Sequence, residues 1–249
     1  RAKELQMRAL KIDERVLGPD HPAIASTLNN LAATLSREGK YDEAMAAYER
    51  VKSIWETDYG PGHPEIGTVL NNIASLHSQR GDDRKALELH EQAQAMWEAA
   101  LPADHPTLAT GLNNLGLVLQ RLGEHERARP ALEEALRIRR KALGEDHLEV
   151  GTSLNNLALL LKSMGELPAA EEHYAAAVEV WERALGAEHP NLAYALTGLG
   201  LTRLAADRPE EALAALERAL SIREKAGASA MLTATTRLAL ADALWSADA

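Results

Sequence analysis

The chain contains no cysteine, only 4% aromatic residues and no long apolar run. Without cysteine there is no disulfide, thiolate metal ligand or cysteine nucleophile. No apolar stretch approaches the roughly 20 residues that a membrane-spanning helix needs. The 27 lysine and arginine residues are outnumbered by 37 aspartate and glutamate residues, which argues against non-specific nucleic-acid binding. These absences predict a cytoplasmic protein that binds neither nucleic acid nor membrane.

A histidine recurs every 42 residues and sets the frame of an internal repeat. The copies are His21, His63, His105, His147 and His189, each followed by proline except the fourth, which precedes Leu148. Eight residues after each of the first four histidines comes a pair of asparagines, at 29–30, 71–72, 113–114 and 155–156. A glycine keeps the same period at Gly39, Gly81, Gly123 and Gly165, until Asp207 breaks the series. Self-similarity at a fixed period is the signature of a repeat protein.

Within one period the apolar pattern is helical. Leu28, Leu31 and Leu35 lie at i, i+3 and i+7, on one face of a helix of period 3.6. The chain then turns near Gly39, and Ala44 begins the apolar face of a second helix. In the first full repeat we expect a first helix over about 22–38 and a second over about 42–58, and we expect equivalent helices in the other repeats. Neither helix can bury its apolar stripe alone, so neighbouring repeats must stack into an all-α solenoid.

These residues carry a family resemblance. Leu28-x-x-Leu31-Ala32-x-x-Leu35, followed by Gly39-x-Tyr41-x-x-Ala44, resembles the tetratricopeptide repeat pattern. The period of 42 and the Leu-Asn-Asn-Leu-Ala core resemble the longer variety found in kinesin light chains. The resemblance implies a superhelix of antiparallel helix hairpins with a concave groove that binds peptides. HEAT or armadillo solenoids have a compatible period, but the small residue at Ala32 and the Gly-x-x-x-x-Ala turn favour the tetratricopeptide type.

The pattern divides the whole chain, residues 1–249, into one array of about twelve helices. We predict a half-repeat at 1–18, full repeats at 21–62, 63–104, 105–146, 147–188 and 189–227, and a half-repeat at 228–249. The chain starts in mid-pattern at Arg1 without a signal peptide, so we expect a fragment of a longer protein. Natural arrays end in polar capping repeats. Since the first helix has an apolar stripe instead, we expect end-to-end self-association.

One residue breaks the helical pattern. Pro130 lies four residues into a predicted second helix, where the first repeat has Ala46. An interior proline removes a hydrogen bond and clashes with the carbonyl at i−4, at a cost of ~3 kcal/mol or more. We therefore expect this helix to start late or to kink near residue 126.

No pattern in the sequence predicts catalysis, a cofactor or a metal site. Equivalent histidines one repeat apart cannot converge on one zinc ion, so we expect them to be loop residues beside helix N-termini. His90, His125 and His173 lie on second helices with no partnering motif. Three tryptophans also share one repeat position, which Arg139 occupies in another copy. They are Trp55, Trp97 and Trp181, and we expect them to pack against the following linker.

The asparagine pairs are the strongest functional signal. Asparagine within a helix costs ~0.5–0.7 kcal/mol relative to alanine, so eight equivalent copies require compensation. Asn29, Asn71, Asn113 and Asn155 adjoin the buried stripe on the side that, by the resemblance, lines the concave groove. Two explanations stand at this point. The amides hydrogen-bond the backbone of an extended peptide, or they bond to each other as structural links between repeats.

The same stripe defines a groove face on the first helix of each repeat. Besides the four asparagines, it is assigned Thr68, Thr110, Thr152, Ser36, Ser78, Gln120, Arg37, Arg121, Lys162, Leu159, Leu201 and Tyr194. Three of these are cations and none is a carboxylate, so we predict a neutral or acidic peptide or protein ligand. The apolar residues toward the C-terminus form either a pocket for an apolar anchor of the ligand or the seat of helices absent from this fragment. We expect a non-catalytic protein-interaction module; the alternative is an oligomerisation or sensor array in a bacterial signalling protein.

Overall fold

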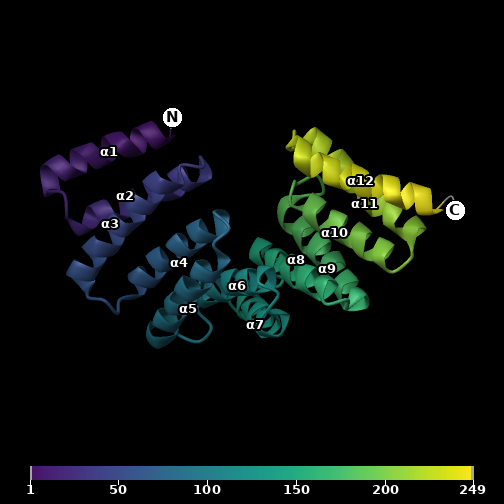
Figure 1. Cartoon of the computed structure of the whole chain (residues 1–249), viewed down its shortest axis with the longest axis horizontal. Coiled ribbons are helices and arrows are strands. Elements are labelled where there is room, and N and C mark those ends of the chain that lie inside the picture. The colour runs from purple at the N-terminus through teal and green to yellow at the C-terminus, as the bar shows by residue number, and fades with distance from the viewer. Residues whose placement is uncertain (1, 248–249) are drawn as a thin grey trace. The chain divides into compact units, whose positions relative to one another are not determined.

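The computed structural model describes the backbone of residues 2–247 and the side chains of residues 5–247, which form twelve helices and no strand (Figure 1). The helices are α1 (Ala2–Leu17), α2 (Pro22–Arg37), α3 (Tyr41–Tyr59), α4 (Pro64–Gln79), α5 (Asp83–Ala100), α6 (Pro106–Arg121), α7 (His125–Leu143), α8 (Leu148–Ser163), α9 (Leu167–Leu185), α10 (Leu192–Ala205), α11 (Pro209–Lys225) and α12 (Ala230–Ala247). The predicted all-α class, helix number and helix limits are confirmed. No helix in the described range is long and apolar enough to cross a membrane.

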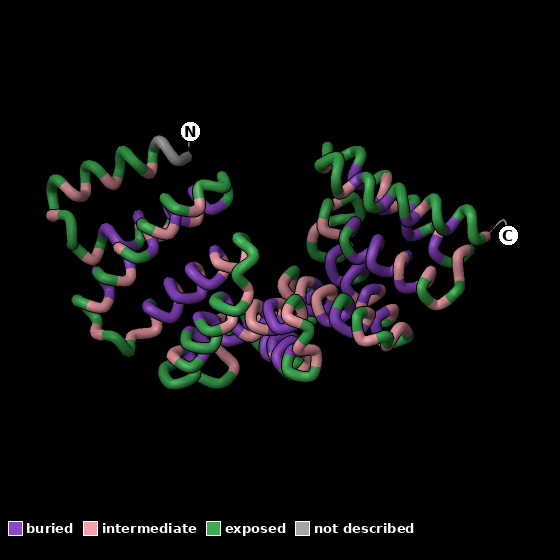
Figure 2. Tube along the Cα trace, viewed as in Figure 1, coloured by how far each residue is buried: buried purple, intermediate pink, exposed green. Residues whose placement is uncertain are grey.

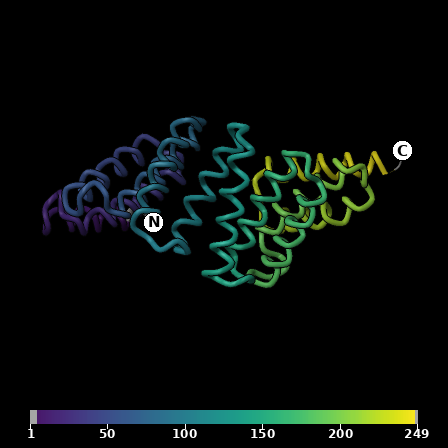
Figure 3. Tube along the Cα trace, turned by 90° about the horizontal axis from the view of Figure 1, so that it is seen from below, coloured from purple at the N-terminus to yellow at the C-terminus, as the bar shows by residue number. Residues whose placement is uncertain are grey.

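The chain forms two compact units, Arg1–Gly123 and Glu124–Ala249. In the first unit α2 packs on α3 and α4 on α5, while the first helices α2, α4 and α6 also contact one another in sequence order. In the second unit α8 pairs with α9 and α10 with α11, and α8, α10 and α12 make the equivalent contacts. Figures 1 and 3 show this side-by-side packing within each unit. This is the helix-hairpin stacking of an α-solenoid.

Burial follows the hairpins. Figure 2 shows the buried residues concentrated on α4 in the first unit and on α8 and α10 in the second. In contrast, α1 and α12 expose large apolar side chains, among them Val16 at 70% and Trp245 at 81% of their surface. The end-to-end association expected from the sequence stays a prediction.

Four of the five recurring histidines are the N-cap residues of first helices, whereas α10 begins at Leu192, after Asn191, and His189 lies two residues before that cap. In all five copies the imidazole Nδ1 accepts a hydrogen bond from the backbone N–H two residues later, at 3.2–3.3 Å. The first N–H groups of a helix have no partner inside it, so an acceptor there stabilises the helix start. The histidines lie in loops beside helix N-termini, as expected. The structure adds that four of them cap the following first helix themselves.

At two of the three positions shared by the tryptophans the indole is a buried, hydrogen-bonded anchor. The indole N–H of Trp97 donates to the carbonyl of Pro64 at 3.0 Å, and that of Trp181 donates to Leu148 at 3.0 Å. Arg139 replaces tryptophan with a guanidinium that donates to Ser153 Oγ at 2.8 Å and pairs with the Glu149 carboxylate at 2.8 Å. Both kinds of anchor join a second helix to the start of a first helix.

Pro130 does not delay its helix. α7 begins at His125 and is as long as α9, so the expected late start is wrong, while the alternative, a kink near residue 126, stays a prediction. Pro130 has no backbone N–H to donate to the carbonyl of Glu126. Both residues are exposed. Water can therefore hydrate that carbonyl, and the ring lies away from the packed face that Ala128 and Leu132 form.

Two equivalent ion pairs between second helices of the second unit have exchanged signs. Arg129 of α7 pairs with Glu166 at the N-terminus of α9. One period later the signs are exchanged, because Glu171 of α9 pairs with Arg208 at the N-terminus of α11. The contact is retained although both residue types have changed.

The Tyr174 ring of α9 packs closely against Gly198 of α10, and this contact generates a stability prediction. An alanine Cβ at Gly198 would overlap the buried Tyr174 ring. Gly198→Ala should therefore cost about 1–3 kcal/mol of unfolding free energy, although alanine is normally about 1 kcal/mol better than glycine in a helix. Chemical denaturation should show this cost disappearing in the Tyr174→Leu background, since leucine occupies the equivalent positions 132 and 216. Equal costs in both backgrounds would contradict the explanation.

Candidate functional site

The asparagine pairs bond the first helices to one another in the first unit. Nδ2 of Asn72 donates to Oδ1 of Asn29 at 3.1 Å, and one repeat later Nδ2 of Asn114 donates to Oδ1 of Asn71 at 3.0 Å. In each case the second member of a pair reaches the first member of the preceding pair, 43 residues earlier. The structural explanation of these residues is thus realised in the geometry, while the Nδ2 groups of Asn29 and Asn71 take no part in these bonds.

A second row of polar contacts runs along the same helices. Ser36 donates to Oε1 of Gln79 at 3.0 Å, again across 43 residues. Arg121 donates to Ser78 Oγ with the same separation, and Ser78 itself donates to Asp83 at 2.6 Å. The predicted groove residues Ser36, Ser78 and Arg121 therefore link successive repeats.

The other predicted groove residues of the first unit differ in exposure. Thr110 and Arg37 are exposed, Asn29, Thr68 and Gln120 are half-buried, and Asn71 and Asn113 are buried. A cavity of about 310 Å³ between the start of α4 and α2 brings together Asn29, Thr68 and Trp55. It also includes Glu65, so a carboxylate lies at this end of the face.

In the second unit, the groove face has both polar and apolar members. Asn155, Thr152 and Lys162 are half-buried, and burial lowers the pKa of the Lys162 ammonium. Leu159 and Tyr194 are 41% and 49% exposed, and the Tyr194 ring lies 5.5 Å from the Arg223 guanidinium. Leu201 is partly covered, because it packs on the cluster around Leu216 that α12 completes.

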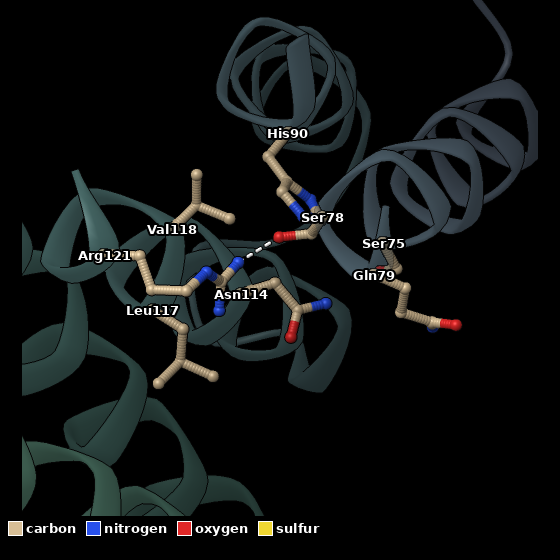
Figure 4. A pocket seen from close by; sticks show the side chains of 8 residues that line it. All are labelled: Ser75, Ser78, Gln79, His90, Asn114, Leu117, Val118 and Arg121. Atoms are coloured by element: carbon tan, nitrogen blue, oxygen red, sulfur yellow. Dashed lines mark hydrogen bonds between the residues drawn. The ribbon is translucent and has the colours of Figure 1, made fainter. Parts of the chain in front are cut away.

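The larger cavity on the groove face lies among α4, α5 and α6, with a volume of about 360 Å³ (Figure 4). Its lining combines the predicted groove residues Ser78 and Arg121 with residues that were not assigned to the groove, among them His90. The lining residues are Ser75, Ser78, Gln79, His90, Asn114, Leu117, Val118 and Arg121. A volume of this size falls within the range of small-ligand and side-chain pockets. Figure 4 shows the imidazole of His90 reaching from α5 toward Ser78 and Arg121.

His90 is the functional candidate that the sequence analysis missed. It is 2% exposed, and its Nδ1 is buried without a hydrogen-bond partner. The equivalent positions in the other repeats hold Tyr48, Leu132, Tyr174 and Leu216. An ionisable residue at a position that otherwise holds core residues was the available signal.

Three ionisable side chains, His90, Arg121 and Asp83, lie at or beside the cavity and differ in charge. Burial and, to a smaller extent, the nearby Arg121 cation together lower the pKa of His90 to about 4, so the imidazole is neutral at pH 7. The Arg121 guanidinium pairs with Asp83 at 2.9 Å. Burial raises the pKa of the Asp83 carboxyl, but hydrogen bonds from Arg121 and Ser78 outweigh it and the net shift is downward. One cation, one anion and a neutral imidazole therefore surround this site.

A family model described as tetratricopeptide repeat matches residues 1–56, 24–99, 107–177 and 150–225. The chain belongs to the tetratricopeptide repeat family. The predicted family is therefore confirmed, and tetratricopeptide repeat proteins are in general scaffolds for protein–protein interaction. No curated protein matches the chain in sequence.

Solved tetratricopeptide structures are similar along most of the chain. BtubC (BKLC) from P. vanneervenii is 22% identical, with a TM-score of 0.76 over 92% of this chain and 94% of BtubC. A putative kinesin light chain from Podosopora anserina with nearly identical TPR-like repeats is 25% identical, with a TM-score of 0.69 over 84% and 99% of the two chains. YrrB, a TPR protein with an unusual peptide-binding site, is 20% identical, with a TM-score of 0.52 over 94% and 98%. The predicted likeness to kinesin light chain arrays is confirmed.

The asparagine links can be tested by stability. Asn71→Ala removes the acceptor of Asn114 and should lower the unfolding free energy by about 1–3 kcal/mol, less a few tenths regained in helix propensity. Asn30→Ala is the matched control, since Asn30 is exposed on the first helix of its repeat and its amide takes no part in these links. Urea denaturation should show the control neutral or slightly stabilised. A neutral Asn71→Ala would assign this amide to ligand binding alone.

His90 predicts an acid-dependent loss of stability. An unfolded histidine has a pKa of about 6.5, whereas burial holds His90 at about 4. The unfolded chain therefore binds an extra proton between these values, and stability falls as the pH is lowered through this window. From pH 7.5 to 4 the loss should be about 3 kcal/mol greater in the native protein than in His90→Leu, which carries the residue found at positions 132 and 216. Parallel stability–pH curves would contradict this.

Proposed function

We propose that the chain is a non-catalytic interaction module that binds a peptide or protein segment along the groove face of its first helices. The observation that carries this proposal is the cavity between α4, α5 and α6, where polar groups from three helices surround an apolar floor of Leu117 and Val118. A second cavity on α2 and α4 holds the predicted groove residues Asn29 and Thr68. Two cavities on successive first helices suit a segment that places side chains at intervals.

The hydrogen-bonding groups of the face favour an extended ligand. Asn29 and Asn71 use their carbonyl oxygens to link repeats, and their Nδ2 donors take no part in those links. Such donors can bond peptide carbonyls whatever the side chains are. Among the solved structures, the description of YrrB as a TPR protein with a peptide-binding site is in line with this use of the fold.

The charge of the cavity favours a neutral or acidic segment. Arg121 lines it, and the one carboxylate nearby, Asp83, is already paired with that arginine. In the second unit Lys162 is the half-buried cation of the face, and the exposed Leu159 and Tyr194 offer an apolar seat. We infer that an acidic or hydroxyl-bearing residue occupies the first-unit cavity and that an apolar residue anchors elsewhere.

Two arginines allow a matched test of the groove. Arg121 and Arg80 each pair with an aspartate 38 residues earlier at 2.9 Å, and both are similarly exposed, but only Arg121 lines the cavity. Peptides selected by phage display on the purified protein should lose about tenfold in affinity with Arg121→Gln, the cost of one charged hydrogen bond. Arg80→Gln should change the affinity less than about twofold, because its side chain lies outside the cavity.

Fluorescence anisotropy with the labelled peptides gives the two dissociation constants. Equal effects of both substitutions would show that ligand contacts lie away from the cavity. Failure to select any peptide would count against the module itself.

A further inference from the structure

Gln79, Asn114 and Arg121 each bring to the cavity between α4, α5 and α6 a donor hydrogen that takes no part in the bonds described above. Oε1 of Gln79 accepts from Ser36, and one hydrogen of the Asn114 amide goes to Asn71, so donor hydrogens of both amides remain. Arg121 uses Nε and Nη2 toward Asp83 and Ser78, while its Nη1 makes no hydrogen bond within the part of the chain described. A site rich in donors matches a ligand group that only accepts hydrogen bonds, such as a carboxylate.

His90 is the one buried group of this cavity with an unsatisfied ring nitrogen. Its helix packs against α4 and α6. α6 presents the Arg121 cation to the cavity, and α4 presents only uncharged side chains there, since its titratable His77 pairs instead with Asp82 at 3.3 Å. On α5 itself Asp83 is engaged by Arg121 and Ser78. The charge acting on the imidazole is therefore positive, and burial together with this charge favours the neutral ring.

We propose that the cavity binds the carboxylate of an acidic ligand residue together with one proton on His90, so that acidic segments bind more tightly as the pH falls. This inference rests on the proposed function and names the chemistry of its first-unit subsite. The proton comes from solvent and adds to the free ring nitrogen, which makes both ring nitrogens donors. A carboxylate oxygen then supplies the acceptor that the buried Nδ1 lacks, and its negative charge offsets the repulsion between the imidazolium and Arg121.

The size of the effect follows from linkage. In the free protein the His90 pKa of about 4 leaves the ring neutral at pH 5.5. If the bound carboxylate restores the ordinary value of about 6.5, the complex takes up a proton between pH 7.5 and pH 5.5. The affinity should then be about tenfold higher at pH 5.5 than at pH 7.5.

N-acetyl-aspartate amide is a suitable probe, because its carboxyl has an ordinary pKa of about 3.9 and stays ionised over this pH range. Titrations followed by NMR give its dissociation constant at pH 7.5 and 5.5, and the imidazole carbon and proton signals give the His90 pKa with and without saturating probe. We expect the His90 pKa to rise from about 4 to about 6.5 in the complex, with an affinity ratio of about tenfold.

Three variants distinguish proton uptake by His90 from the effect of acidification on the charge of the whole protein. His90→Gln should bring the affinity ratio near one, and so should His90→Tyr, which carries the residue found at positions 48 and 174 and guards against misfolding of the first variant. His77→Gln removes a titratable group from the neighbouring helix and should keep the native ratio. Because acidification also makes the whole protein less negative, the ratio in His90→Gln measures that background.

The outcomes are distinct. A native ratio equal to that of His90→Gln, a His90 pKa unmoved by the probe, or no probe-induced shift at the Arg121 and Asn114 side chains would overturn the proposal. Selected acidic peptides that bind with pH-independent affinity would overturn proton uptake while leaving the interaction module standing. If the probe binds with uptake of a proton but no peptide can be selected, proton uptake in the cavity stands and the interaction module is overturned.

Discussion

The amide–amide hydrogen bond between neighbouring first helices is the contact on which the groove face of the first unit depends. It joins Asn29 to Asn72 and Asn71 to Asn114, always 43 residues apart, one more than the sequence period. Ser36 and Gln79 obey the same offset. The bonds join α2 to α4 and α4 to α6, the helices that contribute most of the side chains lining the two cavities. Asparagine is a poor helix former, so its presence at these places is explained by what it fixes in space.

This arrangement also shows why one set of residues can serve packing and recognition. An asparagine side chain has one carbonyl and one NH₂ group. The inter-repeat bonds use the carbonyl of Asn29 and of Asn71, which leaves donors on the face where a peptide backbone would present carbonyl oxygens. The two explanations offered by the sequence are compatible, because each uses a different end of the amide.

Much of the fold was predictable because it depends on local periodicity. The repeat of 42, the apolar stripe of Leu28, Leu31 and Leu35, and the turn at Gly39 each involve residues close in sequence, and the helix limits agree. The capping role of the histidines was missed, since it depends on the orientation of a side chain at a helix start. His90 was missed for a related reason. Its burial against Arg121 arises only when α5 packs between α4 and α6, and nothing next to it in sequence indicates this. Pro130 was misjudged because its cost depends on whether the affected carbonyl faces solvent.

The exchanged ion pairs of the second unit bear on how such an array is inherited. Tandem repeats recombine readily, and loss of one period between α7 and α9 would splice the chain after Arg129 to the residue that follows Glu171. Arg129 would then take the place of Glu171, beside both Arg208 and Arg203, which Glu171 now binds. Three cations would meet where one anion had held two of them. Because the signs of the pair are exchanged between these two repeats, each second helix matches the charges of its present neighbours. A chain that had lost this one repeat in frame would be destabilised by the repulsion.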